Sequence, residues 1–465
     1  MEMHSEQGKD AAASPTLSEA IADYAVNLEY ENLPPEVVHT AKRIVLDTIG
    51  CAIGGHRSGP ARIAQQLAAR FRSQPPATVM CTGLKTSHDM AVFANGVMIR
   101  YLDFNDGFIS KASGHPSDVL APLLTTADVC GRSGRDLIAA LVAAYEVFAH
   151  IADAIEARAQ GLDQSTILGL AAVVGIGKLM GLSRDQLVNA IGITVGGNTA
   201  INQGRVGTLS NWKNYATAEA SRKAVFSALL AQAGMSGPRD VFEGRDGWMN
   251  AIYRKPFTVA PWGGEPYGIM RALTKRFALG QYSQTVAQAA LEARAHFKSP
   301  DEIAEVNVHV SRGAIRIMAA SPEKWRPQTH ETADHSMPYS TGVALMHGAV
   351  TADHYEAPYL HDEKLLALVA RVKVHPSEEA DHREDETNLC DLELVLKSGA
   401  RHTVRVEYHR GHHKNPMTDA EMEEKFRRLA STHLEAGRLD ALLRQLWKLD
   451  DMPLAGKLID LTLAS

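Results

Sequence analysis

The chain has 465 residues, enough for about three domain-sized units and for a core that needs no disulfide staples. Hydrophobic residues make up 45% of the sequence and charged residues 22%, which excludes a disordered or fibrous protein. The 48 basic and 54 acidic residues leave a net charge of −6, which argues against nucleic-acid binding and against electrostatic attachment to an anionic membrane.

The four cysteines, at positions 51, 81, 130 and 390, are far apart. This spacing excludes a disulfide framework, the usual zinc layouts and an iron–sulfur centre. Isolated cysteines suit a reducing compartment, so we expect a cytoplasmic protein. The first residues are polar and lack the apolar core of a signal peptide, and we expect residues 1–16 to form a disordered tail. The sequence has no run of about eighteen apolar residues, so it predicts no membrane span.

The first part of the chain, from Leu17 to about Gly237, has the apolar periodicity of helices. Pro34 and Pro35 open one of them, as proline does in a first helical turn, and Ser183 is expected to cap another. Alanine and glycine on packed faces predict a compact bundle. The main predicted helices cover residues 17–28, 35–49, 135–158 and 165–181.

The pattern changes after about Gly263, where alternating segments predict strands between helices. Thr418 and Glu421 have the spacing of a capping box, and the helices after them have bundle character. The sequence therefore predicts a mostly α fold. A large all-helical domain takes residues 17–265 and 418–465, and a smaller α+β domain takes residues 266–417. The predicted strands cover 306–311, 371–376 and two parts of 391–409, and the predicted helices 284–297, 337–350 and 435–447.

Segment 95–118 is the richest in ionisable side chains, with Arg100, Asp103, Asp106 and His115 around a glycine-containing loop. Carboxylates that face a histidine can divide general acid and base work. The alternative is structural: Asp103 or Asp106 caps a helix, and His115 bonds to loop carbonyls.

Two further segments supply cations. In 203–222, Lys213 lies where a loop becomes a helix and Arg205 lies in the preceding glycine loop. A helix N-terminus together with cations binds carboxylates, although a solvated basic face is the alternative. In 273–285, Lys275 opens the predicted second domain, where a solvated linker is the alternative.

Segment 321–339 offers Asp334, His335 and Tyr339 ahead of an apolar helix, which Asp334 or Ser336 could instead cap. The sequence has no dinucleotide fingerprint, phosphate-binding loop, HExxH zinc motif or GxSxG nucleophile motif. We therefore expect an acid/base site that is rich in cations and uses no metal and no cofactor.

Together these segments resemble the MmgE/PrpD family, the family of 2-methylcitrate dehydratase. The matching strings run in order from residue 46 to residue 339, so the resemblance spans most of the chain. They are LDTIGCAIGG (46–55), NGVMIRYLDFND (95–106), GHPSDVLAPLL (114–124), GKLMGLS (177–183), NAIGITVG (189–196), WKNYATAEASRKAVFSALLA (212–231), GPRDVFEG (237–244) and ETADHSMPY (331–339).

The resemblance implies a helical domain with a smaller α+β lid, a homodimer, and a cofactor-free site in the cleft between the domains. It implies dehydration of a hydroxylated tricarboxylate, with 2-methylcitrate giving 2-methylaconitate. Decarboxylation of cis-aconitate and epimerisation of a related substrate are alternatives within the family, and a catalytically silent helical scaffold is the alternative outside it. The expected catalytic residues are Asp103, His115, Lys213 and Lys275, and the expected substrate-binding residues are Arg205, His335, Tyr339 and Gln164.

Three positions depart from the family pattern. Gly107 and Gln164 stand where many relatives have threonine and histidine, and Tyr282 stands where dehydratases often have histidine. Because glycine and glutamine cannot shuttle protons, either these positions only shape the pocket or the substrate differs from 2-methylcitrate.

Overall fold

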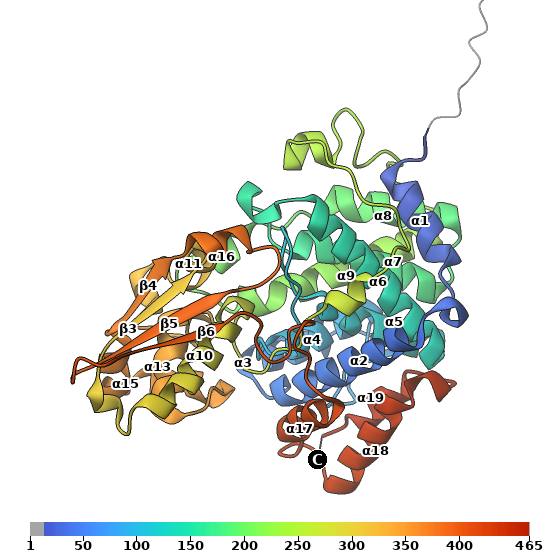
Figure 1. Ribbon diagram of the computed structural model, residues 1–465. Helices are drawn as coiled ribbons and strands as arrows, with labels where there is room; N and C mark the ends of the chain where they lie inside the picture. The colour runs from blue at the N-terminus through green and yellow to red at the C-terminus, as the bar shows by residue number, and fades with distance from the viewer. Residues whose placement is uncertain (1–13, 465) are drawn as a thin grey trace, which may run out of the picture.

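The computed structural model describes residues 14–464 and consists of two lobes (Figure 1). The larger lobe, here called the helical unit, also holds a short hairpin of β1 (Ala77–Thr78) and β2 (Lys85–Thr86). Its helices are α1 (Leu17–Asn27), α2 (Pro35–Gly55), α3 (Gly59–Ala68), α4 (His88–Arg100), α5 (Leu120–Cys130), α6 (Gly134–Ala154), α7 (Ser165–Met180), α8 (Arg184–Gly197), α9 (Trp212–Gln232), α17 (Asp419–Ala430), α18 (Ala436–Trp447) and α19 (Lys457–Leu461).

The smaller lobe, here called the lid, is built on a four-stranded sheet with the order β4-β3-β5-β6. The strands are β3 (Ile303–Val310), β4 (Val372–Pro376), β5 (Cys390–Leu396) and β6 (Arg401–Val406). Only β3 and β4 are parallel, and Val308 lies opposite both Val374 and Leu392. The helices α10 (Gln284–Ala293), α13 (Met337–His347) and α15 (Glu363–Val369) cover one face of the sheet (Figure 1). The predicted fold class, mostly α with a smaller α+β part, is confirmed.

Each of the two lobes has its own large hydrophobic core. The core of the helical unit draws residues from Ile21 to Ile269 and again from Met417 to Ile459, whereas the core of the lid lies between Phe277 and Val406. The last helices therefore pack on the first ones, and a Cβ added at Gly50 of α2 would lie 3.0 Å from the Phe426 ring of α17. The predicted boundaries at residues 266 and 418 stay predictions.

Short sequence patterns predicted the positions of most helices correctly. Ser183 caps α8 as predicted, and the predicted capping box at Thr418 is present at the start of α17. Helix α6 ends at Ala154, before the predicted residue 158, because Ile155 takes an extended conformation. Most of the predicted disordered tail, residues 1–13, lies outside the described residues. Thr16, at the end of that predicted tail, caps α1 instead.

Helix α6 is long and apolar enough to cross a membrane by length and composition, and it is the one described helix that is. In this fold 83% of its apolar window is buried inside the chain. Its apolar residues are therefore used by the core of the helical unit.

A close approach between α4 and α9 positions the functional residues. A Cβ added at Gly96 of α4 would lie 2.8 Å from the Cβ of Ala218 in α9, so a larger residue at position 96 would push the helices apart. This contact lies near the C-terminal end of α4 and the N-terminal end of α9. It brings Lys213 beside the loop that carries Asp103.

Candidate active site

Asp103 is the residue on which the buried charges converge. It follows the end of α4, is 0% exposed, and has a backbone φ of 46°, a left-handed conformation that is strained for a residue other than glycine. Its Oδ1 accepts hydrogen bonds from Arg100 Nη1 at 2.7 Å and from Lys275 Nζ at 2.5 Å. Its Oδ2 lies 3.3 Å from Lys213 Nζ and 3.0 Å from His335 Nδ1.

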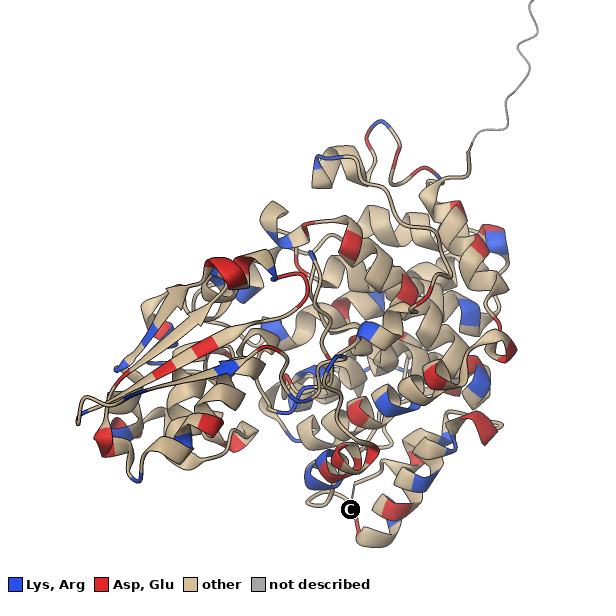
Figure 2. Cartoon of the chain, in the orientation of Figure 1, with Lys and Arg blue, Asp and Glu red and all other residues tan. Residues whose placement is uncertain are grey.

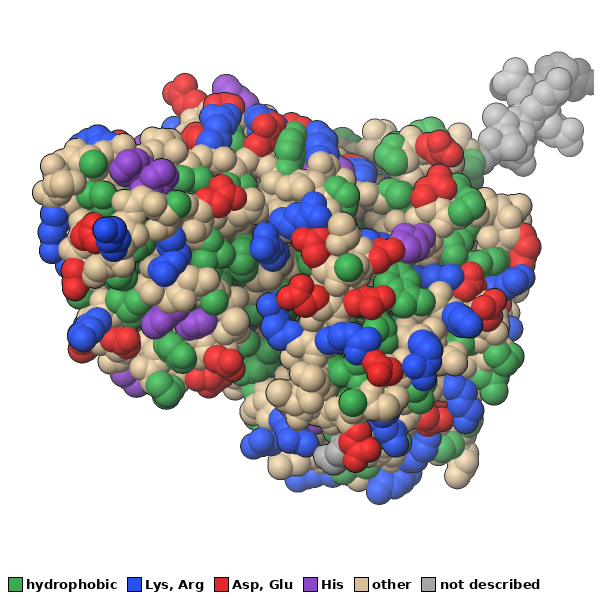
Figure 3. Space-filling view, turned by 60° about the horizontal axis from the view of Figure 1, so that its bottom comes forward, with side chains coloured by type: hydrophobic (Ala, Val, Ile, Leu, Met, Phe, Trp, Pro, Cys, Tyr) green, Lys and Arg blue, Asp and Glu red, His purple; other side chains and the backbone are tan. Residues whose placement is uncertain are grey.

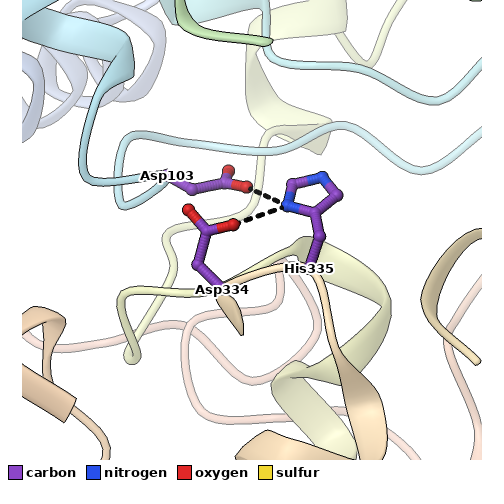
Figure 4. A group of neighbouring side chains, drawn as sticks. All are labelled: Asp103, Asp334 and His335. Atoms are coloured by element: carbon purple, nitrogen blue, oxygen red, sulfur yellow. Dashed lines mark hydrogen bonds and ion pairs between the residues drawn. The ribbon is translucent and has the colours of Figure 1, made fainter. Parts of the chain in front are cut away.

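The lid contributes a second carboxylate to the same cluster (Figure 4). Lys213 donates a short hydrogen bond to Asp334 Oδ2, and His335 Nδ1 lies 3.0 Å from Asp334 Oδ1. Ser336, not Asp334, caps α13, since its side chain accepts the hydrogen bond of Tyr339 N–H. Asp334 is therefore free to pair with Lys213 across the boundary between the helical unit and the lid.

His115 is held at two points, which leaves one ring nitrogen facing Asp103. Its Nδ1 lies 2.7 Å from the carbonyl oxygen of Asp106, so Nδ1 carries the proton and donates. Its backbone N–H donates to Gln164 Oε1 at 2.6 Å. The remaining nitrogen, Nε2, lies 3.8 Å from Asp103 Oδ1. In the neutral ring, Nε2 has a lone pair that can accept a proton.

The surrounding cations keep the carboxylates ionised. Burial alone would raise the pKa of Asp103, but Arg100, Lys275 and Lys213 outweigh burial and hold this pKa well below its usual range. Burial would also raise the pKa of Asp334, but Lys213 and His335 together outweigh burial and lower this pKa. The site therefore combines fixed negative charge with several ammonium and guanidinium groups.

For His115 and Lys275, a lowered pKa favours the neutral form instead of the charged one. Burial, together with Arg100 and Lys275, holds the pKa of His115 well below its usual range, so its ring is neutral at neutral pH. Burial lowers the pKa of Lys275 to about 8, although Asp103 partly offsets this effect. A neutral base and a weakly acidic ammonium are therefore present at one carboxylate.

Asp103, Asp334 and His335 could together offer a metal three ligand atoms within 4.8 Å of one another. Their oxygens already face cations, since Lys213 contacts both carboxylates and Lys275 contacts Asp103. A divalent cation would have to enter beside these ammonium groups. The donor set therefore fits an ion-pair network better than a metal site.

Two predicted substrate-binding residues lie outside this cluster. Arg205 Nε donates to Asp163 Oδ2 at 2.9 Å, and its Nη1 donates to the carbonyl oxygen of Lys213 at 3.2 Å. Arg205 thus holds the start of α9 in place. Tyr339 gives its hydroxyl hydrogen to the carbonyl oxygen of His354 at 2.9 Å. Their contact with a substrate stays a prediction.

The three departures from the family pattern each have a structural setting. A Cβ added at Gly107 would lie 2.6 Å from Gln281 Oε1, so a threonine there requires other packing. Gln164 accepts the hydrogen bond of the His115 backbone N–H, as described above. The hydroxyl of Tyr282 accepts a hydrogen bond from Arg158 at 2.5 Å, and the guanidinium lies 5.2 Å from the ring centroid. Among the described residues, no hydrogen bond or ion pair joins any of these three positions to Asp103.

Sequence patterns do not predict several members of the site. Arg100 lies within a predicted segment but without a predicted role, and the pattern around Asp334 also fits a helix cap. Outside the cluster, Lys324 and Tyr355 are buried in the lid, with 2% and 1% of their surfaces exposed, and neither has a predicted role, although Lys324 lies within the predicted segment 321–339. Among the described residues neither polar side chain has a hydrogen-bond partner, a feature that exists only in the folded chain.

The cluster is closed to solvent in this conformation. Its lysines and aspartates are 0% exposed, and His115 and His335 are 5% and 6% exposed. A cavity of about 180 Å³, lined in part by Arg205, Trp212 and Lys213, reaches the cluster from the side of α9. A larger cavity of about 630 Å³ is lined by residues of 195–252 and by no member of the cluster.

The exposed charges are distributed differently from these buried ones. Basic and acidic residues are intermingled over both lobes (Figure 2). On the face shown in Figure 3, side chains of both signs are interspersed with hydrophobic ones, and the outline is notched where the lobes meet. The concentration of cations at Asp103 lies in the interior, where Arg100, Lys213 and Lys275 are each 0% exposed.

Comparison with known proteins places these residues in a family context. The family model for the MmgE/PrpD N-terminal domain matches residues 19–259, and the model for the MmgE/PrpD C-terminal domain matches residues 277–449. The chain is 26% identical over 456 residues to "2-methylcitrate dehydratase, mitochondrial" of Yarrowia lipolytica, covering 91% of this chain and 85% of that protein. It is 26% identical over 438 residues to 2-methylcitrate dehydratase of Escherichia coli strain K12, covering 84% and 85%. It is 24% identical over 454 residues to the human cis-aconitate decarboxylase, covering 94% and 92%.

Proposed function

The chain belongs to the MmgE/PrpD family, and on this basis we propose that it is a cytoplasmic, homodimeric lyase that dehydrates a hydroxylated tricarboxylate without a cofactor. The proposed substrate is 2-methylcitrate and the proposed product is 2-methylaconitate. The observation that carries the proposal is the convergence of Arg100, Lys213 and Lys275 on Asp103 beside the neutral ring of His115. Relatives that are named as dehydratases and a decarboxylase support an enzyme.

The first requirement of this reaction is removal of a proton from carbon next to a carboxylate. The electron pair left behind spreads onto that carboxylate, so the transition state gains negative charge that cations must stabilise. Lys213 and Lys275 supply the stabilising positive charge. Their site is dry, so the attraction is stronger than it would be in water. His115 Nε2 takes the proton, because its Nδ1–H is already committed to Asp106.

The second requirement is protonation of the departing hydroxyl. The ammonium of Lys275, whose pKa is about 8, can donate that proton near neutral pH. The carbon–hydrogen and carbon–oxygen bonds break, the carbon–carbon double bond forms, and water leaves. The proton that His115 took from carbon then passes to Lys275, which restores the starting state of both residues.

A direct assay separates this proposal from its alternatives. The pure protein is incubated with 2-methylcitrate, citrate or cis-aconitate, and products are followed by ultraviolet absorbance of the conjugated alkene and by carbon dioxide release. Alkene formation from 2-methylcitrate supports the dehydratase. Carbon dioxide from cis-aconitate would instead identify a decarboxylase, and a protein that alters none of these compounds would leave the scaffold alternative.

The pH profile should show a fall on the alkaline side. We expect kcat/KM to drop as pH rises through about 8, because Lys275 is charged below its pKa of about 8 and neutral above it. An ordinary lysine would give this fall near 10.5. Between pH 6 and about 7 the rate should stay flat, since the lowered pKa of His115 keeps its ring neutral there. A profile that declines only above about pH 10 would contradict the role of Lys275.

Removal of metal should leave the activity unchanged. We expect full turnover after extensive dialysis against a chelator, because the oxygens of Asp103 and Asp334 are held by lysines. Elemental analysis of the dialysed protein is the accompanying measurement. Stoichiometric iron or zinc that tracks with activity would overturn the cofactor-free proposal.

A further inference from the structure

Lys324 is a buried lysine whose ammonium group makes no hydrogen bond within the described part of the chain. Its side chain is 2% exposed, and its Nζ has no hydrogen-bond partner among the described residues. An ammonium taken out of water and left unpaired strongly disfavours folding, so proteins seldom keep one that has no use. Either Lys324 binds an anion in the functional protein, or this residue destabilises the fold without any compensating role.

Lys324 lies on the lid side of the cluster. It ends the short helix η10 (Pro322–Lys324), and its carbonyl oxygen accepts a hydrogen bond from the hydroxyl of Ser336, the residue next to His335. Burial lowers the pKa of Lys324 to about 8, and the nearby charge of Asp334 partly offsets this effect. Asp334 pairs with Lys213, and among the described residues no hydrogen bond joins Lys324 to Asp334.

A second unpartnered donor lies beside the same carboxylate. Tyr355 ends the short helix η11 (Ala352–Tyr355), is 1% exposed, and has no hydrogen-bond partner for its hydroxyl among the described residues. Its ring packs edge-on against the ring of His330, with the centroids 5.5 Å apart, and His330 Nε2 lies 4.0 Å from Asp334 Oδ2, which places Tyr355 near the cluster. An ammonium and a phenol hydroxyl are both donors to a carboxylate.

We propose that Lys324 binds a carboxylate of the substrate that is not attached to the reacting carbon, with Tyr355 as a further donor on the lid side. Lys213 and Lys275 hold the carboxylate that gains charge during the reaction, and Lys324 selects a molecule with another carboxylate. This proposal rests on the proposed function in requiring a polycarboxylate substrate. In this proposal, the lid makes the protein prefer a polycarboxylate to a monocarboxylate.

The test is calorimetric titration of the full-length protein with propane-1,2,3-tricarboxylate, which lacks a hydroxyl group and cannot be dehydrated. Lys324→Met should weaken binding about 10- to 100-fold, the effect of losing a hydrogen bond to a charged group. Tyr355→Phe should weaken it about 2- to 10-fold. With 2-methylcitrate, Lys324→Met should raise KM far more than it lowers kcat, because this contact is the same in the ground state and the transition state.

A matched control and a stability measurement separate binding from structure. Lys178 is a partly buried lysine of the helical unit, and its Nζ donates to the carbonyl oxygen of Ala25 at 3.0 Å, so Lys178→Met should leave affinity unchanged. Without ligand, Lys324→Met should keep or raise Tm, because it removes an unpaired buried charge.

The outcomes distinguish the two proposals. If wild type binds the tricarboxylate and Lys324→Met binds it equally well, the role of Lys324 is wrong and the proposed function stands. If Lys324→Met lowers Tm at unchanged affinity, the lysine is structural and the proposal also fails. If wild type neither binds the tricarboxylate nor converts 2-methylcitrate, both proposals fall.

Discussion

Replacing His115 with alanine should lower kcat by about 100- to 10,000-fold, the usual contribution of one general acid or base. The reason is geometric as well as electrostatic. Nδ1 is committed to the carbonyl oxygen of Asp106, Nε2 faces Asp103, and the lowered pKa keeps the ring neutral and able to accept a proton. The measurement is kcat with 2-methylcitrate under saturating conditions, with circular dichroism as a check that the variant is folded.

The control for this variant is another buried, neutral histidine. His88 begins α4, the helix that leads to Asp103, and its Nε2 lies 2.9 Å from the hydroxyl of Thr126. Burial lowers its pKa to about 4, yet no contact joins it to the cluster among the described residues. His88→Asn should therefore keep near-full turnover. Near-full turnover in folded His115→Ala as well would place the base elsewhere.

Replacing Lys213 with alanine should lower kcat by about 100- to 1000-fold, the effect of losing one group that stabilises developing negative charge. The loss should fall on kcat more than on KM, since the charge grows only on the way to the transition state. The same change should lower Tm. Lys213 is the partner of Asp334 and a neighbour of Asp103, and breaking a buried pair leaves an uncompensated charge that costs about 3–5 kcal/mol.

A double variant separates the two effects of Lys213. In Lys213→Met with Asp334→Asn, the lysine and one carboxylate are removed together, so Tm should recover much of what Lys213→Ala loses. Turnover should stay low, because no ammonium replaces the missing one. Recovery of both Tm and turnover would mean that Lys213 serves only to neutralise Asp334.

Much of the fold is predictable because its signals are local. The capping boxes at Ser183 and Thr418, and the burial alternation of β5, depend on neighbours a few residues apart, so the amino-acid order alone indicates them. Helix ends are less predictable. Helix α13 ends at His347, where Gly348 takes a left-handed conformation, although the apolar pattern continues to residue 350.

The amino-acid order is enough to indicate the fold class, the family resemblance and the chemical types in the site. Asp103, His115, Lys213 and Lys275 are all candidates on the strength of their residue types and of the short motifs that contain them. Such motifs carry this information because they depend on covalent order, which is the same in the unfolded and the folded chain.

Which charges meet, by contrast, depends on the tertiary structure. Lys213 and Asp334 are separated by 121 positions in the chain, and the fold joins them across the boundary between the helical unit and the lid. The fold also commits Tyr339 to a backbone carbonyl and leaves Lys324 buried without a hydrogen-bond partner among the described residues. Burial, pairing and the direction of a lone pair depend on what surrounds a group in space, and residues remote in sequence supply those surroundings.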